Sequence, residues 1–395
     1  MSIPVIPMLV IFFEKTGIIF MNRLRGMTSA IALLAFLFLI AMGQYPACAD
    51  EAWKQAIAPR QWQFPRDHGA HPEFRTEWWY FTGNVTDALG TRFGYQVTFF
   101  RHGIRTEAID PANPWSLRDI YPAHFAITNV TGASFVHNDR ISRAGPGLAG
   151  ADVRTMDVWN LDWSARMENG TIRLSARHVD MDLDVTLRPR KPLVLHGENG
   201  LSRKGPRPGQ ASYYYSFTDL ETTGTLKTHG LNRPVAVTGT SWFDHEFASN
   251  SLSEDQAGWD WFSLHFSDGR DLMLYVLRKT DGSLEKESSG TIVEPDGRAR
   301  HLSLSDIKIS VLGTWQSQKT GGRYPNRWRI DIPSADLSFV IATLLPDQEL
   351  TTSDSTRINY YEGVVAGTGS SNRKEVRCEG YVEMTGYAGT IGGLF

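Results

Sequence analysis

Two carboxylates separated by a single histidine lie among aromatic residues at 241–247, which read SWFDHEF. Alternate residues of a strand share a face, so Trp242, Asp244 and Glu246 lie together and His245 lies on the opposite face. Two close carboxylates repel each other, which raises the pKa of one of them and makes it a candidate proton donor. The alternative is a charge cluster at a domain junction, neutralised by an arginine elsewhere in the chain.

A third carboxylate lies between two tryptophans at 258–262, which read GWDWF. In a strand Trp259 and Trp261 share one face, and Asp260 lies on the other. Aromatic faces stabilise a developing cation, and a neighbouring carboxylic acid can supply the proton that creates it. The alternative is a pair of core tryptophans beside a capping aspartate.

Glu77 lies in another aromatic run, RTEWWYF at 75–81, where it shares a strand face with Trp79. A carboxylate on an inward face is costly unless it is paired. Arg75, on the same face, is the expected partner. The pair either holds the mouth of a barrel together, or Glu77 faces a ligand cavity.

The remaining polar candidates give weaker signals. His124 lies in YPAHFA with no other residue at metal-ligand spacing, and His68 and His71 are too few for a metal site. Glu362 and Glu383 belong to the closing strands and are expected at a solvated or paired rim. The sequence holds no G-x-S-x-G elbow, H-E-x-x-H pair, Walker loop or dinucleotide fingerprint. We therefore expect no metal and no cofactor, and neither a serine hydrolase nor a metallopeptidase.

Period-two alternation of apolar and polar residues recurs through most of the chain and predicts antiparallel strands. Asn169 and Gly170, for example, follow one such run and favour a type I′ hairpin turn. No amphipathic helix is predicted. The sequence indicates an all-β protein whose sheets close into barrels or sandwiches, with a boundary at 248–257 and a Gly/Pro-rich surface loop at 197–210.

Residues 1–49 are predicted to be a cleavable signal peptide. Basic residues at 21–25 precede an uncharged apolar run at 30–42, and small residues at 46–49 then form a signal-peptidase site. The apolar run is shorter than the roughly twenty residues that a membrane-spanning helix needs. We therefore expect the protein in the periplasm or outside the cell.

Two details of this segment allow alternatives. Met21 and Met27 are alternative starts, because a separate apolar stretch precedes them. A lipid anchor on Cys48 is not expected, because Tyr45 stands where that processing needs a Leu-like residue.

Composition narrows the class of protein. The chain is 41% hydrophobic and 21% charged, as in ordinary globular proteins. A net charge of −3 gives no reason to expect nucleic acid as a partner. Once Cys48 leaves with the signal, Cys378 is the one cysteine of the sequence, so neither a disulfide framework nor a cysteine zinc cluster is expected. Twelve Trp, thirteen Tyr and twenty Phe suit wide β-surfaces and also a pocket for a large apolar ligand.

The motifs RTEWWYFTG, YPAHFA, SWFDHEF, GWDWFS, YYEG and GYVEMTGY, in this order, resemble the AttH/CrtC family. That family comprises lipocalin-like secreted proteins and the carotenoid 1,2-hydratases. The resemblance spans roughly residues 60–390. It implies two consecutive lipocalin-like antiparallel β-barrel domains, at 60–250 and 255–390, and a cavity for a large apolar ligand.

The resemblance implies one of two functions. The first is an exported carrier of an apolar, isoprenoid-like or lipid-like molecule that works beside a membrane transporter. The alternative is a cofactor-free hydratase, a lyase rather than a hydrolase, that adds water to an isoprenoid C=C after protonation by a carboxylic acid. Export weighs against an enzyme that acts on membrane pigments from the cytoplasm, so the carrier is the leading hypothesis.

On the hydratase hypothesis, the residues named above take chemical roles. Asp260 or Glu246 is the expected acid, and Trp259 or Trp261 is the expected cation stabiliser. The further candidates are Asp244 and His245 for catalysis, with Trp242, Glu77, Trp79 and His124 as ligand-facing residues.

Overall fold

The computed structural model describes residues 53–107, 112–113, 115–249 and 252–389. The predicted signal peptide at 1–49 lies outside the described residues. In the described part of the chain, no helix has the length and apolarity needed to cross a membrane. The described structure is almost entirely β-strand, and its helical elements are the short 3-10 turns η1 (Arg66–His68), η2 (Leu304–Asp306) and η3 (Pro333–Ala335).

The first antiparallel sheet has thirteen strands, and its main order is β4-β3-β2-β1-β13-β12-β9-β8-β7-β6-β5. The short strands β10 and β11 also pair with β12. The strands are β1 (Thr76–Asp87), β2 (Arg92–Gly103), β3 (Asp119–Asn129), β4 (Ser134–Arg143), β5 (Ala149–Ala151), β6 (Asp157–Asn160), β7 (Trp163–Glu168), β8 (Thr171–His178), β9 (Met181–Pro189), β10 (Val194–Leu195), β11 (Leu201–Arg203), β12 (Ala211–Lys227) and β13 (Val235–Ala248).

Side-chain hydrogen bonds draw the two ends of this sheet together into a nearly closed barrel. Asn160 on β6 is fully buried, and its Nδ2 donates to the Tyr121 carbonyl of β3 at 2.6 Å. From β4, Ser142 Oγ donates to Asn160 Oδ1 at 2.8 Å, and Arg140 Nη1 donates to the Asn160 carbonyl at 3.2 Å. The Asn160 side chain therefore links the two edges of the sheet, which the backbone hydrogen bonds of the strands do not join.

The predicted alternation is confirmed in the strands that line the barrel. On β9 the apolar residues at 181, 183, 185 and 187 are buried, while the polar residues between them are partly exposed. Asn169 and Gly170 both have positive φ, 51° and 74°, as a type I′ turn requires. The barrel interior is filled by side chains from both ends of the sheet, including Trp79 and Trp163.

The second antiparallel sheet has ten strands in the main order β17-β16-β15-β14-β23-β22-β20-β19-β18, with β21 pairing with β22. The strands are β14 (Gln256–Phe266), β15 (Asp271–Lys279), β16 (Ser289–Val293), β17 (Ala299–Ser303), β18 (Lys308–Gln316), β19 (Arg323–Ile332), β20 (Leu337–Thr343), β21 (Glu349–Thr351), β22 (Asn359–Ser371) and β23 (Lys374–Met384).

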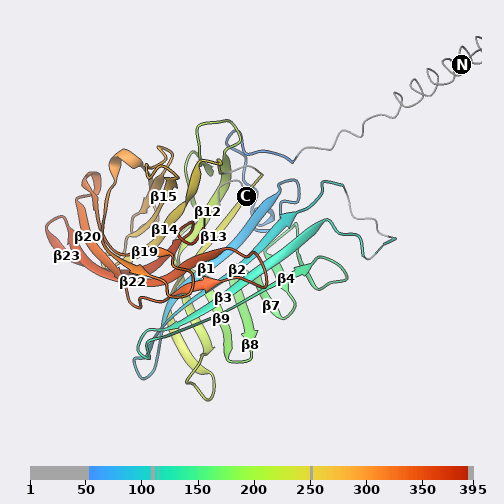
Figure 1. Cartoon of the computed structure of the whole chain (residues 1–395), viewed down its shortest axis with the longest axis horizontal. Coiled ribbons are helices and arrows are strands. Elements are labelled where there is room, and N and C mark those ends of the chain that lie inside the picture. Colours follow the sequence, from blue (N-terminus) through green and yellow to red (C-terminus); the bar gives the residue numbers. More distant parts are fainter. Residues whose placement is uncertain (1–52, 108–111, 114, 250–251, 390–395) are drawn as a thin grey trace, which may run out of the picture. The chain divides into compact units, whose positions relative to one another are not determined.

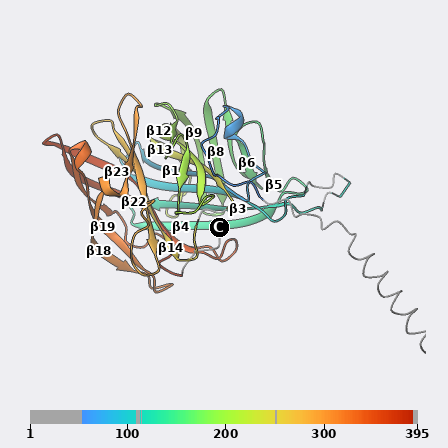
Figure 2. The same cartoon turned by 90° about the horizontal axis from the view of Figure 1, so that it is seen from above.

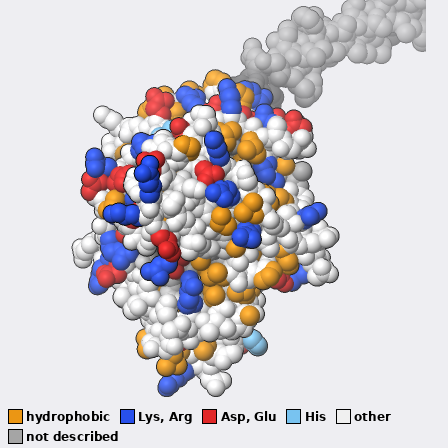
Figure 3. Space-filling view, turned by 90° about the vertical axis from the view of Figure 1, so that its left-hand side faces the viewer, with side chains coloured by type: hydrophobic (Ala, Val, Ile, Leu, Met, Phe, Trp, Pro, Cys, Tyr) orange, Lys and Arg blue, Asp and Glu red, His pale blue; other side chains and the backbone are white. Residues whose placement is uncertain are grey.

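The all-β fold with two antiparallel sheets is confirmed, although the second sheet forms a half-barrel. Its concave side holds a separate apolar core that includes Phe262, Trp328 and Val382. The yellow-to-red strands of this sheet lie beside the blue and green strands of the first in Figure 1 and Figure 2. Figure 3 shows basic and acidic side chains interspersed over the face that it views.

A third apolar cluster joins the two sheets. It includes Tyr80 and Trp242 from the first sheet and Trp261, Met273 and Val364 from the second. These residues alternate along their strands with residues of the two sheet cores, so each strand contributes one face to a core and the other face to the junction. The outward face of the barrel therefore packs against the second sheet.

We expect Asn160→Ala to lower the free energy of unfolding by about 1–3 kcal/mol, because it leaves the buried Tyr121 carbonyl without its donor. Urea unfolding followed by tryptophan fluorescence measures this change. Asn138→Ala, at a half-buried site on β4, is the matched control. Equal and small losses for both variants would show that Asn160 does not hold the barrel edges together.

Candidate functional site

A cavity lies between the two sheets rather than inside either of them. One wall is the outward face of the barrel, and the other is the side of the second sheet that faces it. The cavity volume, with its open mouth included, is about 1010 Å³. The lining residues are Trp78, Tyr80, Thr98, Phe100, His124, Lys204, Tyr214, Asp244, Glu246, Leu252, Trp259, Trp261, Tyr275, Leu277, Thr356, Ile358, Tyr360, Glu383 and Thr385.

The register of the first sheet sets a row of polar residues across the barrel wall. Tyr80 on β1 pairs with Thr98 on β2 and with Asp244 on β13. His124 on β3 pairs with Thr98, and Ser216 on β12 pairs with Asp244. These five side chains lie side by side because cross-strand partners share a face.

The second sheet sets an opposing row. Trp261 on β14 pairs with Tyr275 on β15 and with Glu383 on β23, and Glu383 pairs with Glu362 on β22. The two rows meet directly at Tyr80, whose hydroxyl donates to Glu362 Oε2 at 2.8 Å. The Tyr80 and Trp261 rings pack edge to face at 5.1 Å.

Exposure distinguishes the outer part of the cavity from its inner end. Trp78, Phe100 and Trp259, one step outward along their strands, are partly exposed. Trp242 and Tyr381, one step beyond the two polar rows, are buried and are not among the lining residues. A ligand that enters past the outer aromatic residues would therefore meet the buried carboxyl group of Asp244 at the inner end.

Asp244 is a buried carboxylate surrounded by hydrogen-bond donors. Tyr214 Oη donates to Asp244 Oδ2 at 2.6 Å, and Trp242 Nε1 donates to Oδ1 at 2.6 Å. Ser216 Oγ also donates to Oδ1. Burial raises the pKa of Asp244 to about 7, against these donors and with a further contribution from the nearby charge of Glu246.

Glu383 reaches the cavity from the opposite sheet. Trp259 Nε1 donates to Glu383 Oε2 at 2.8 Å. Burial raises the pKa of Glu383 to about 7 despite this hydrogen bond, and Asp244 and Glu246 raise it further. Two carboxyl groups on facing walls therefore change protonation state near neutral pH.

A buried ion pair flanks Asp244. Lys204 Nζ lies 3.1 Å from Glu246 Oε1 and 4.0 Å from the centre of the Tyr275 ring. Burial opposes the charge of Lys204, but Glu246, Tyr275 and Asp244 together outweigh it and raise the pKa of Lys204. The site therefore contains a fixed cation beside its acidic residues.

His124 closes another side of the cavity as a neutral imidazole. Its Nδ1 lies 2.7 Å from Tyr360 Oη, and its Nε2 lies 3.0 Å from Ser355 Oγ. Burial, with a contribution from His137, lowers the pKa of His124 to about 3. Ser355 Oγ in turn donates to Asp139 Oδ2 at 2.7 Å, so His124 is held by a polar chain from outside the cavity.

The residues predicted from sequence divide between different faces. Asp244, Glu246, Trp259, Trp261 and His124 line the cavity, and Trp242 lies behind Asp244 as a donor. Asp260 is on the other face of β14, where it pairs with Arg278 at 3.0 Å and accepts a bond from Tyr387. His245, Glu77 and Trp79 face the interior of the barrel.

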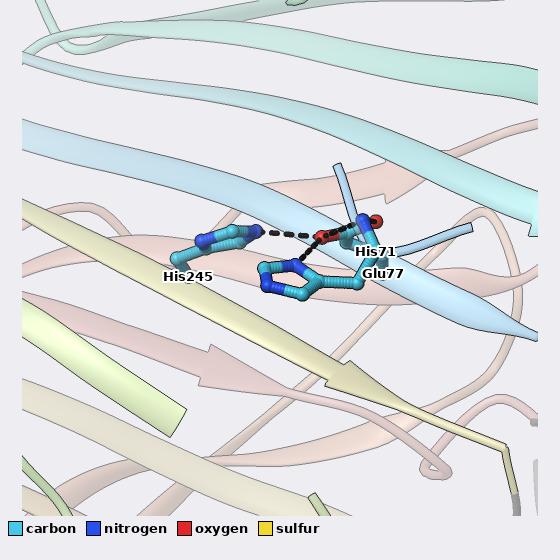
Figure 4. A group of neighbouring side chains, drawn as sticks. All are labelled: His71, Glu77 and His245. Atoms are coloured by element: carbon cyan, nitrogen blue, oxygen red, sulfur yellow. Dashed lines mark hydrogen bonds and ion pairs between the residues drawn. The ribbon is translucent and has the colours of Figure 1, made fainter. Parts of the chain in front are cut away.

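Glu77 forms a buried polar network with His71 and His245, as Figure 4 shows. Its Oε1 lies 2.8 Å from His71 Nδ1 and 2.9 Å from His245 Nε2. Arg101 Nε donates to Oε2 at 3.0 Å. The predicted partner Arg75 is exposed, so that prediction is wrong, and Arg101 on the neighbouring strand takes its place.

His71, Glu77 and His245 have the donor atoms of a metal site, but their contacts fit a structural network better. Both histidine nitrogens already point at one carboxylate oxygen at hydrogen-bond distance. Arg101 is an adjacent fixed cation, which disfavours a second positive charge. Burial opposes the charge of Glu77, but its bonds to His245 and His71 and the charge of Arg101 outweigh it and hold the pKa of Glu77 well below its usual range.

Sequence reasoning missed several residues of the cavity. Lys204 belongs to the Gly/Pro-rich segment predicted as a surface loop, yet it is buried. The prediction that Glu362 lies at a rim is also wrong, because this side chain is fully buried between the sheets. Glu383 is half-buried, lines the cavity and accepts a hydrogen bond from Trp259. Tyr214 had a signal in the alternation of 211–217, whereas Lys204 had none, since tertiary packing alone brings it to Glu246.

Comparisons with known proteins agree on the fold. A model of the AttH-like family matches residues 55–387. A crystal structure from Nitrosomonas europaea, of a protein that carries the AttH name, has a TM-score of 0.75 and 33% identity, covering 85% of this chain and 99% of that one. Kievitone hydratase from Nectria haematococca has a TM-score of 0.63 at 18% identity, covering 86% and 97% of the two chains, and shares the fold.

A curated relative is the dehydratase asqC of Emericella nidulans. It is 21% identical over 219 residues, which cover 54% of this chain. The match spans 61% of asqC, less than two thirds of that protein.

We expect Glu77→Gln to lower the free energy of unfolding by about 3–5 kcal/mol at pH 7, because it removes the buried carboxylate that Arg101, His71 and His245 share and leaves Arg101 with Asp119 as its carboxylate partner. The folded-state pKa of Glu77 lies below its unfolded value, so its contribution is present above the unfolded pKa and is lost as pH falls. Urea unfolding at pH 7 and in acid should therefore show a gap from wild type that shrinks on acidification. Glu73→Gln, on a nearby partly exposed carboxylate, is the control, and a pH-independent gap would contradict this account.

We expect Glu246→Gln to lower the apparent pKa values of both Asp244 and Glu383, because its negative charge raises both. Carbon-13 NMR titration of labelled carboxyl groups measures the two values. Asp260→Asn, on the other face of β14, should leave both titrations near pH 7. Unchanged titrations in Glu246→Gln would show that the three carboxyl groups do not share one electrostatic environment.

Proposed function

Because this chain belongs to the AttH-like family, we propose that it binds a largely apolar small molecule between its two sheets and adds water to it or removes water from it. The observation that carries this proposal is the pair Asp244 and Glu383. They reach one aromatic-walled cavity from opposite sheets, and burial raises the pKa of each to about 7. A carrier needs the apolar wall, but it has no need of two carboxyl groups poised to exchange protons.

The hydrogen-bond environments distinguish the roles of the two carboxyl groups. Asp244 accepts bonds from Tyr214, Ser216 and Trp242, which stabilise its ionised form. For Glu383 the described structure gives one such donor, Trp259 Nε1. We assign the protonated state to Glu383, as the general acid, and the negative charge to Asp244, as the general base.

In the elimination direction, Glu383 gives its proton to the leaving hydroxyl and the C–O bond breaks, with its electron pair leaving in water. Asp244, the general base, receives a proton from the adjacent carbon, and the electrons of that C–H bond form the new C=C. Hydration is the reverse. Trp259 and Trp261 line the same space, where their faces would stabilise positive charge that develops at carbon.

The named relatives support this chemistry, since asqC is called a dehydratase and the Nectria haematococca structure a hydratase. These names describe the two directions of one reaction. The proposal differs from the carrier favoured by sequence and moves the acid from Asp260 or Glu246 to Glu383. Export and a transporter as partner belong to the carrier alternative, which would use the same cavity.

We expect Asp244→Asn and Glu383→Gln each to reduce turnover by about 100-fold or more while leaving ligand binding largely intact, because each removes a proton-transfer group. Mass spectrometry first identifies the ligand that copurifies with the protein. That compound and a panel of prenyl alkenes and tertiary alcohols are then incubated with the protein in oxygen-18 water, and label uptake or water loss is measured. Tryptophan fluorescence titration measures binding.

Asp260→Asn is the control, because its carboxyl group lies outside the cavity and should leave turnover unchanged. Wild-type kcat/KM should peak near pH 7, rising as Asp244 ionises and falling as Glu383 loses its proton. Binding without turnover in the wild type would favour the carrier. Full turnover in both cavity variants would overturn the assigned acid and base.

A further inference from the structure

Tyr214 lies where Asp244 meets the ligand space. Its ring lines the cavity, and its side chain is 1% exposed. Its hydroxyl donates to Asp244 Oδ2 at 2.6 Å and accepts from Trp261 Nε1 at 3.1 Å. A phenol oxygen has two lone pairs, so one remains for a group in the cavity.

The other oxygen of Asp244 is held by groups that lead away from the cavity. Trp242 Nε1, a donor with no acceptor capacity, occupies Oδ1 together with Ser216 Oγ. The Ser216 oxygen lies 2.6 Å from His196 Nε2, and His196 Nδ1 lies 2.9 Å from Thr291 Oγ1. Trp242 is fully buried behind the cavity wall.

The protonation state of His196 fixes the direction of this chain. Burial, with contributions from Lys204 and His301, holds the pKa of His196 well below its usual range, so the ring is neutral and has one N–H. Ser216 donates to Asp244 and must therefore accept from His196 Nε2, which leaves Nδ1 to accept from Thr291. Both positions on Oδ1 are thus taken by donors that cannot receive a proton from the ligand.

We infer that Tyr214 is a catalytic residue, which touches the substrate and relays the proton between it and Asp244. This inference rests on the proposed water-adding or water-removing function. In elimination, the substrate C–H proton moves to Tyr214 Oη while the Tyr214 O–H proton moves to Asp244 Oδ2. Tyr214 begins and ends as a neutral phenol, and Asp244 gains the one proton that the substrate carbon loses.

Two neighbours stabilise the oxygen of Tyr214 while the protons move. Trp261 Nε1 donates to it, and Lys204 Nζ lies 5.1 Å from the centre of the Tyr214 ring. Burial, Asp244 and Glu246 raise the pKa of Tyr214 well above its usual range, so a free phenolate does not form near neutral pH. Transfer of both protons in one step avoids that phenolate.

The test compares turnover and binding of Tyr214→Phe with those of Tyr213→Phe. Tyr214→Phe should lose about 100-fold in kcat, because it removes the relay but keeps the ring that packs against the ligand. Tyr213 lies on the inward face, and its hydroxyl donates to the Ala58 carbonyl, so its variant should keep wild-type turnover. Near-UV circular dichroism checks that both variants fold.

A proton inventory of the wild type gives a second readout that needs no variant. Turnover is measured in the hydration direction, where the protons on Asp244 and Tyr214 both exchange with solvent. In mixtures of H2O and D2O it should curve downward for two protons in flight, and Tyr214→Phe should reduce that curvature. If Asp244→Asn and Glu383→Gln abolish turnover while Tyr214→Phe retains at least half, the relay is wrong and the proposed function stands. If the carboxyl variants keep full turnover, the relay is overturned together with the assigned acid–base pair, because turnover would then need no transfer of a proton to Asp244.

Discussion

The buried pair of Glu77 and Arg101 holds the strand register on which the cavity depends. The two residues are direct cross-strand partners on β1 and β2, and His245 on β13 binds the same carboxylate. Side chains alternate between faces, so a slip of one residue in these strands would turn Tyr80 and Asp244 into the barrel and Glu77 out of it. Burial of this network costs free energy, and leaving one of its members unpaired would cost more than the intact pair contributes. The network therefore disfavours every other register of these strands.

The cavity lies outside the barrel, between its outward face and the second sheet. The lipocalin-like resemblance implied a cavity for a large apolar ligand without placing it. Side chains such as Trp79 and Trp163 fill the interior of the first barrel, and Phe262 and Trp328 fill the core of the second sheet. The space lies where the two outer faces meet. Two separate cores supply the stability that allows acidic residues to be buried between them, since each core packs independently of the junction.

Burial of Asp244 and Glu383 is the source of their chemistry. In water these carboxyl groups would be ionised at neutral pH and would be poor proton donors. Desolvation raises both pKa values toward 7, while the hydrogen bonds of Asp244 favour its ionised form. Aromatic walls and the fixed charge of Lys204 complete an environment suited to moving protons to and from an apolar molecule.

Sequence by itself determined the strand content, the faces of each strand and the membership of the family. Period-two alternation placed Asp244 with Glu246 and Trp242, and Trp259 with Trp261, because side-chain direction in a strand follows from local geometry. It could not say which face of a strand meets which neighbour. Asp260 was therefore proposed as the acid alongside Glu246, although it faces Arg278, and Glu383 was expected at a rim.

Only the tertiary structure decided which residues share the site. Lys204 and Glu246 are separated by a Gly/Pro-rich loop and an entire hairpin, and Asp244 and Glu383 belong to different sheets. Their meeting depends on how two curved sheets pack, a long-range property that no local pattern encodes. The raised pKa values follow from that packing as well, because desolvation exists only once the second sheet covers the first.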